Sequence, residues 1–238
     1  FGSGYKNGEG TLNLLGRIDV EDVRGSLDIN AGTIILGAAD RLGDRLTVLV
    51  NGGTLDLAGN AEKIDRLVLT SVRVTSAQGA LEAASFDVEQ GLITAVLVGP
   101  GRLSKTTAGD VTLGRVNTYA GGTVVDAGRL ILGVSGALSS AGAVKVNAGE
   151  LALGATTQSV GELSSVLAGP AGLLKNGTGE ARLSSVNTFV GGTVVDAGRL
   201  VLGVSGALAS SGAVTLNAGE LALGSTTQTV GLVTVHGG

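Results

Sequence analysis

The sequence predicts an all-β fold, a parallel β-helix (solenoid) in which the chain winds through roughly ten to eleven coils of about 19–26 residues each. Three observations support this fold class. A long segment occurs twice with few changes, a shorter unit recurs inside it, and the apolar residues of each unit alternate with others as they do in strands. The frequent glycines interrupt every helical apolar stripe, so no helix is expected.

The long repeat runs from Val116 to Val160 and returns as Val186 to Val230, 70 residues later. A diverged copy, residues 26–59, aligns with the first close copy at a larger separation, and the extra residues fall around Leu69 to Val88. We therefore expect one continuous β-helix over residues 1–238, with diverged coils in 1–100 and close repeats at 116–160 and 186–230. The chain reads as an interior piece of a longer polypeptide.

A shorter unit recurs inside each copy. The heptapeptide AGRLILG at Ala127 is followed 21 residues later by AGELALG at Ala148, and AGRLVLG at Ala197 precedes AGELALG at Ala218 by the same distance. A unit of this length accommodates one coil of strands and is too short for a pair of helices.

The alternation within these strands predicts which side chains form the core. Successive side chains of a strand point to opposite faces, so the leucines of each L-x-L run should face inward and stack in one row from coil to coil. A slip of one residue would expose a whole row, which fixes the register. The residues expected in this row are Ile34, Leu36, Leu55, Leu57, Val111, Leu113, Leu130, Leu132, Leu151, Leu153, Leu200, Leu202, Leu221 and Leu223.

An asparagine precedes the glycine of many turns. Asn30, Asn51, Asn147 and Asn217 recur at equivalent places, and Asp126 and Asp196 occupy the intervening turns. Asparagine and glycine tolerate positive φ, and asparagine side chains bond to nearby backbone groups. We interpret these residues as a structural turn ladder that bonds one coil to the next and holds no ligand.

The outward members of the same strands are unusually apolar in the close copies. Ile35, Ile131, Ala152, Val201 and Ala222 define a candidate face for lateral association, and Asp56, Thr112 and Arg182 are outward at related positions. A continuous apolar row on a flat sheet would be able to pack against another rod. The alternative is that single β-branched residues are present here because they favour strands.

Composition excludes several classes of protein. A net charge of −4 and no basic cluster argue against a nucleic-acid partner. The absence of cysteine excludes a disulfide framework and a thiolate metal site. No apolar stretch approaches the roughly 18–20 residues of a membrane span, so membrane insertion of this segment is not expected.

Two motifs carry a family resemblance. They are GRLSKTTAGDVTLGRVNTYAGGTVVDAGRLILG, residues 101–133, and GLLKNGTGEARLSSVNTFVGGTVVDAGRLVLG, residues 172–203. This combination resembles the autotransporter-associated β-strand repeat of bacterial surface proteins, clearly over residues 91–235 and more loosely over residues 8–68. The resemblance implies a right-handed parallel β-helix in a secreted passenger or surface adhesin of a Gram-negative type of cell. It transfers no catalytic residues.

An enzyme is not expected. His236 is the single histidine, so neither a catalytic triad nor a histidine-based metal site can be built, and we predict no cofactor. The densest acidic stretch contains Asp19, Glu21 and Asp22, followed by Asp28. It would suit a weak Ca²⁺ site or, more simply, a solvated turn or strand edge.

The expected function is that of a non-enzymatic structural or adhesive rod at the bacterial exterior, acting in adhesion, aggregation or a biofilm matrix. The main alternative is a self-associating, filament-forming extracellular protein, and a β-helix polysaccharide-degrading enzyme is less favoured. The expected partners are neighbouring repeats of the same protein, or a glycan or matrix ligand on a host surface. The expected location is extracellular, on the outer cell surface.

Overall fold

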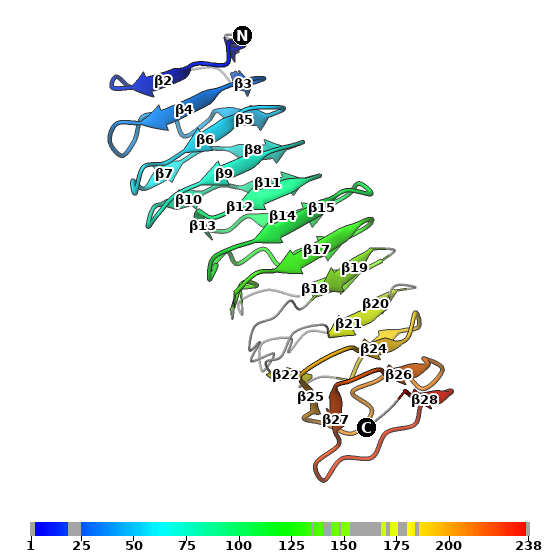
Figure 1. Cartoon of the computed structure of the whole chain (residues 1–238). Helices are drawn as coiled ribbons and strands as arrows, with labels where there is room; N and C mark the ends of the chain where they lie inside the picture. Colours follow the sequence, from blue (N-terminus) through cyan, green and yellow to red (C-terminus); the bar gives the residue numbers. More distant parts are fainter. Residues whose placement is uncertain are drawn as a thin grey trace.

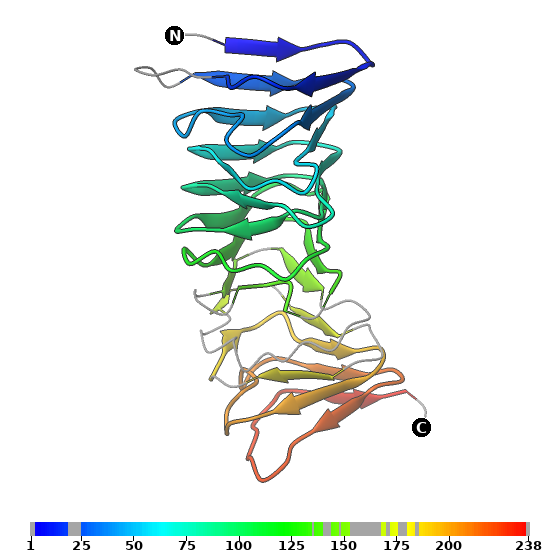
Figure 2. The same ribbon diagram turned by 90° about the vertical axis from the view of Figure 1, so that its left-hand side faces the viewer.

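The computed structural model describes residues 3–18, 25–134, 136–139, 144–147, 149–152, 168–169, 172–175, 180–183 and 186–236. Over these residues the chain forms short strands joined by turns, and it contains no helix. Strands of successive coils pair in parallel and build an elongated stack with the two chain ends at opposite ends (Figures 1 and 2). No helix in these ranges is long and apolar enough to cross a membrane. The predicted parallel β-helix of ten to eleven coils is confirmed.

Two long sheets form most of the rod. The eight-stranded sheet contains β1 (Ser3–Lys6), β3 (Ser26–Ile29), β5 (Thr47–Val50), β8 (Arg66–Leu69), β11 (Ser85–Val88), β14 (Arg102–Lys105), β16 (Thr123–Val125) and β18 (Val144–Val146). The 12-stranded sheet contains β2 (Thr11–Leu14), β4 (Thr33–Leu36), β6 (Thr54–Asp56), β9 (Arg73–Thr75), β12 (Gly91–Ile93), β15 (Asp110–Leu113), β17 (Arg129–Leu132), β19 (Glu150–Ala152), β21 (Leu173–Lys175), β24 (Thr193–Val195), β26 (Val214–Leu216) and β28 (Val233–Val235).

Three shorter sheets complete the described coils. One pairs β7 (Glu62–Lys63), β10 (Ala80–Glu82) and β13 (Val96–Val98), and a second pairs β20 (Ala168–Gly169) with β23 (Thr188–Phe189). The third contains β22 (Glu180–Leu183), β25 (Arg199–Leu202) and β27 (Glu220–Ala222).

The register sets the length of a coil. Thr112 pairs with Ile131, 19 residues later, and the extremes among the paired strands are Ala80 with Val96 and Ser3 with Ser26, separated by 16 and 23 residues. The extra residues 69–88 form one full coil. Each of its three strands, β9, β10 and β11, pairs with one strand of the preceding coil and one strand of the following coil. The insertion therefore lengthens the rod by one turn without disturbing its register.

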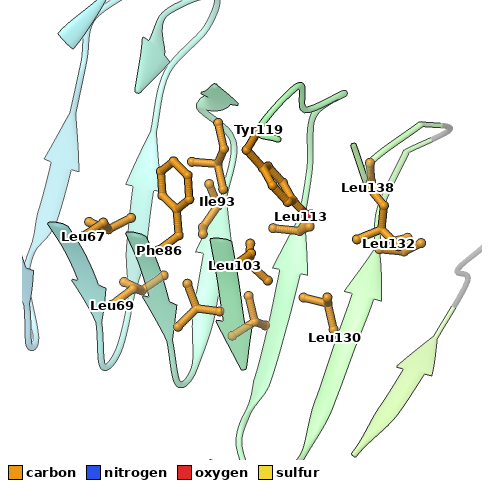
Figure 3. Packing of buried hydrophobic residues seen from close by; sticks show 14 of the residues in the cluster. Leu67, Leu69, Phe86, Ile93, Leu103, Leu113, Tyr119, Leu130, Leu132 and Leu138 are labelled. Atoms are coloured by element: carbon orange, nitrogen blue, oxygen red, sulfur yellow. The ribbon is translucent and has the colours of Figure 1, made fainter. Parts of the chain in front are cut away.

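Inward-facing side chains stack in rows along the rod axis. One row joins Ile34, Leu55, Val74, Ile93, Leu113 and Leu132, which are paired in succession and buried. Figure 3 shows part of this core, with Phe86 and Tyr119 among the leucines. Most predicted inward residues are buried, but Leu223 is 45% exposed because it follows β27, the last strand of its sheet. Leu153 lies outside the described residues.

The prediction of one common row for both close copies is wrong. The strand after β19 in the 12-stranded sheet is β21, with Leu151 paired to Leu173. In the first copy the equivalent of β21 is β14, which belongs to the eight-stranded sheet. Equivalent strands of the two copies therefore lie on different faces of the solenoid. We call this shift the phase change between the copies. Parallel hydrogen bonding and apolar alternation are the same on every face, so neither specifies which face follows which.

One turn residue is strained. Gly32, Gly128 and Gly198, which directly precede β4, β17 and β25, have φ values of 69°, 64° and 70°. Val72 precedes β9 at the same place and has φ 76°. A left-handed backbone is costly for a β-branched residue because its Cβ approaches the neighbouring backbone.

We expect Val72→Gly to stabilise the chain by about 1 kcal/mol, the strain relieved less the backbone entropy that glycine loses on folding. Chemical denaturation of the full chain measures this change. The reverse substitution, Gly128→Val, is the matched control and should destabilise, because a Cβ at Gly128 would lie 2.4 Å from the carbonyl oxygens of Gly109 and Thr107. A less stable V72G variant would show that Val72 carries no strain.

Candidate functional site: polar supports and outer faces of the rod

The predicted turn residues form hydrogen bonds from coil to coil. Asn30 Nδ2 donates to Asn7 Oδ1 at 2.7 Å, and Asn51 Nδ2 donates to Asn30 Oδ1 at 3.0 Å. In the close copies, Asn147 Nδ2 donates to Asp126 Oδ1 and Asn217 Nδ2 donates to Asp196 Oδ1, each at 2.6 Å. These side-chain amides are thus hydrogen-bonded to neighbouring coils, so they have a structural role in holding the coils together.

A second support is a buried lysine at the end of a strand. Lys105 is fully buried at the end of β14, and its Nζ donates to the carbonyl oxygens of Thr107 and, at 3.2 Å, of Ala127 in the next coil. Lys175 and Lys6 repeat the arrangement, donating to Ala197 O at 3.2 Å and Ala31 O at 3.1 Å. The charged group of each lysine therefore ties a turn to the turn one coil further on.

Sequence analysis did not assign a role to these lysines. The signal that could have found them is a lysine at an inward position of a strand in three related motifs, KNGEG, KTTAG and KNGTG. Burial lowers the pKa of Lys105, and the carboxylates of Asp110 and Glu89 partly oppose this shift. Burial likewise lowers the pKa of Lys175.

A third support is the asparagine of the NTY and NTF motifs. Asn117 is buried, accepts from Leu97 N at 2.8 Å and donates to Ala137 O at 2.6 Å, so it joins the coils on both sides. Asn187 donates to Ala207 O at 2.6 Å in the second copy. These residues, too, serve the core and do not form an open site.

The aromatic residue two positions further on is also internal. The Tyr119 hydroxyl lies 2.6 Å from Thr123 Oγ1, and burial raises the pKa of Tyr119 to about 12. Its ring lies 6.0 Å from that of Phe86, centroid to centroid. Phe189 is the buried equivalent in the second copy.

The five residues predicted to share an outer face do not share one. Ile35, Ile131 and Ala152 lie on the 12-stranded sheet, whereas Val201 and Ala222 lie on the separate sheet of β22, β25 and β27. This separation follows from the phase change between the copies.

The expected exposure is also wrong for three of the five. Ala152 is 0% exposed, and Val201 and Ala222 are 9% exposed. Ala152 is paired between Ile131 and Leu174, whose larger side chains flank it, and Val201 is paired with Arg182.

The apolar outer row that does exist follows the 12-stranded sheet through both copies. It joins Leu92, Thr112, Ile131, Ala152, Leu174, Val194, Thr215 and Thr234 by successive pairing. We call it the outer apolar row. Leucine, β-branched residues and alanine fill it between β12 and β28, and the next paired residue beyond Leu92 is the charged Arg73.

Rows of alternating charge accompany the strands. Arg129 lies 3.3 Å from Asp110 and 3.4 Å from Glu150, and in the second copy Arg199 lies 3.0 Å from both Glu180 and Glu220. These side chains are between one third and two thirds exposed, so solvent screens each pair and each contributes little to stability.

A hollow of about 560 Å³ opens on the 12-stranded sheet where the two copies meet. It lies over β17, β19, β21 and β24, which are neighbours in Figure 1. Its lining consists of Gly128, Arg129, Gly149, Glu150, Gly172, Leu173, Leu174, Gly191, Gly192 and Val194. It combines five glycines with three apolar residues and one ion pair.

No metal centre is found in the described ranges, where no group of three or more His, Cys, Asp or Glu residues gathers. The candidate Ca²⁺ ligands Asp19, Glu21 and Asp22 lie outside these ranges. Asp28 is on β3.

Comparison with known proteins agrees with this architecture. The family model described as the passenger-associated-transport-repeat matches residues 103–132, 126–153, 173–202 and 197–223. A relative, the adhesin BmaC autotransporter of Brucella suis biovar 1 (strain 1330), is 29% identical over 79% of this chain. The match spans 6% of that protein's length. No solved structure matches.

The fold and the matched repeats are similar to those of passenger-type autotransporter repeat proteins, and both comparisons support a protein of this type. The predicted family resemblance is confirmed over the four matched repeats, which lie within residues 91–235. A passenger repeat and an adhesin relative also agree with a non-enzymatic chain that is secreted or displayed at the cell surface.

We expect Lys105→Met to lower the free energy of unfolding by about 1–3 kcal/mol, because the carbonyls of Thr107 and Ala127 lose a buried charged donor. Urea denaturation of the full chain measures this loss. Since the folded-state pKa of Lys105 is lowered from 10.5, the native chain gains stability relative to K105M as the pH rises through that pKa toward 10.5.

The matched control is Lys63→Met, which removes a half-exposed ammonium paired with Glu82 at 3.2 Å. Its expected effect is at most about 1 kcal/mol. Equal losses for K105M and K63M would contradict the role assigned to the buried lysine.

Proposed function

We propose that this chain is a length of the exported rod of a bacterial adhesin, positioned on the outer surface of a Gram-negative type of cell. The observation that carries the proposal is that the conspicuous polar residues of the repeats lie inside the rod and have structural partners there. The buried lysines and asparagines described above join coils, and the buried tyrosine is hydrogen-bonded inside the core, so recognition is left to the outer faces of the sheets. The adhesin relative supports the same assignment.

Displaying the full chain on the outer surface of a non-adherent bacterial host should make the cells bind to a matrix-coated or glycan-coated surface. The rod contributes both reach and contact area, so binding should exceed that of the same host displaying an unrelated passenger. Counting retained cells after washing measures it. Retention no better than that of the control host on every coating tested would overturn the adhesive role.

A second function, lateral self-association, is favoured by the outer apolar row. Eight successive strands place an uncharged residue there, and Leu174 and Val194 are only half-buried. Two rods that pack along this row would bury its partly exposed apolar residues, Leu92, Ile131, Leu174 and Val194, together with its threonines. Lateral packing of this kind would lead to aggregation or to a biofilm matrix.

We expect Ile131→Lys to reduce the association of the purified chain by placing a charge in the middle of the row. Sedimentation velocity measures the associated fraction. The matched control is Val124→Lys, which places the same charge on an outward position of the eight-stranded sheet. Equal effects of I131K and V124K, or a native chain that stays monomeric at all concentrations, would refute lateral association through this row.

A further inference from the structure

The hollow arises where a row of charged side chains stops. Asp110, Arg129 and Glu150 occupy successive strands immediately before the inward residues Val111, Leu130 and Leu151. The next two positions of this row, set by the pairing of Leu151, Leu173 and Thr193, are Gly172 and Gly192. The phase change between the copies brings these two residues into the row, and Gly172 stands where the first copy has Arg102. The row therefore continues as bare backbone, and the sheet surface is open beside Glu150.

The floor of the hollow cannot take up a peptide as an added strand. Glu150 N donates to Gly128 O at 2.8 Å, and Leu173 N donates to Gly192 O at 2.9 Å, so the backbone groups there already pair between coils. Strand addition requires a free sheet edge, and the hollow lies over paired strands. Recognition must come from side chains and from close approach to the glycine backbone.

The polar wall of the hollow, Arg129 with Glu150, is partly open to solvent. Arg129 Nε and Glu150 Oε1 are buried against each other 3.4 Å apart, whereas the two side chains as a whole are 40% and 33% exposed, so a ligand would meet their remaining nitrogen and oxygen atoms. Asp110 flanks the same guanidinium at 3.3 Å. Two carboxylates around one guanidinium leave a local negative charge, which disfavours an acidic ligand.

A neutral sugar fits this combination of groups. Its hydroxyls donate to carboxylates and accept from a guanidinium, and charged partners make such hydrogen bonds stronger. Its C–H faces suit the apolar wall formed by Leu174 and Val194. The hollow crosses four successive strands, so a chain of sugars would lie along the rod axis.

We propose that the hollow between β17 and β24 binds a neutral oligosaccharide, with Arg129 and Glu150 contacting its hydroxyls and Leu174 and Val194 contacting its ring faces. This inference rests on the proposed adhesive function and names a ligand class and a site for it. The chain supplies an internal control, because Glu180, Arg199 and Glu220 repeat the charge pattern on the sheet of β22, β25 and β27, away from the hollow.

The test uses the purified full chain and three neutral tetrasaccharides, cellotetraose, mannotetraose and chitotetraose, with tetragalacturonate as the acidic counterpart. Binding is measured by saturation-transfer NMR and by titration. At least one neutral tetrasaccharide should bind, and tetragalacturonate should bind at least about tenfold more weakly. Glu150→Gln should weaken binding about tenfold, whereas the matched Glu220→Gln should leave it within about twofold. Thermal melts of both variants verify that the fold is intact.

Three results would overturn the site: no binding of any neutral tetrasaccharide, equal binding of the acidic one, or equal weakening by E150Q and E220Q. Should E150Q unfold, Leu174→Lys provides a second variant, because it places a long charged side chain in the hollow from an outward position of β21. Unchanged binding by L174K would also overturn the site. Cells that adhere through the chain while no tetrasaccharide binds would refute the sugar site and leave the adhesive function standing.

Discussion

The structure depends on one constraint, the parallel backbone pairing of each coil with the next. This pairing fixes the distance between equivalent positions at about 4.8 Å, so each inward side chain must pack on its counterpart in the adjoining coils. Rows such as Ile34, Leu55 and Val74 satisfy it with branched apolar residues of similar size. The rod therefore tolerates one added coil at residues 69–88 but does not tolerate a shift of one residue within a strand.

The same constraint explains the polar residues of the repeats. Turns between short strands leave carbonyl and amide groups close to the core, and buried polar groups are costly unless they are hydrogen-bonded. Lys105 reaches carbonyls in its own coil and the next, and Asn117 joins the coils on both sides. The motifs that identify the repeat family are thus the residues that complete the backbone pairing where strands end.

The sequence predicted those features of the fold that apolar alternation and turn chemistry determine. The strands, the buried leucines and the positions of the turn asparagines follow from patterns of two residues and of about 21 residues. The stacking of one copy on the next was not predictable, because β19 could pair equally well with a strand of any face. The burial of Ala152 between Ile131 and Leu174 was missed for the same reason, since its neighbour on one side is set by that stacking.

The phase change gives nearly identical repeats different exteriors. In the second copy, Glu180, Arg199 and Glu220 lie on a short sheet of their own, whereas the equivalent row of the first copy ends against the glycines that precede β21 and β24. The inward side chains of every face are apolar, so any face can stack on any other with similar core packing. A change in stacking therefore alters the outer surface with little loss of packing energy. The hollow with an apolar wall and an ion pair arises from this change in stacking together with two substitutions, because Gly172 and Leu174 stand where the first copy has Arg102 and Ser104.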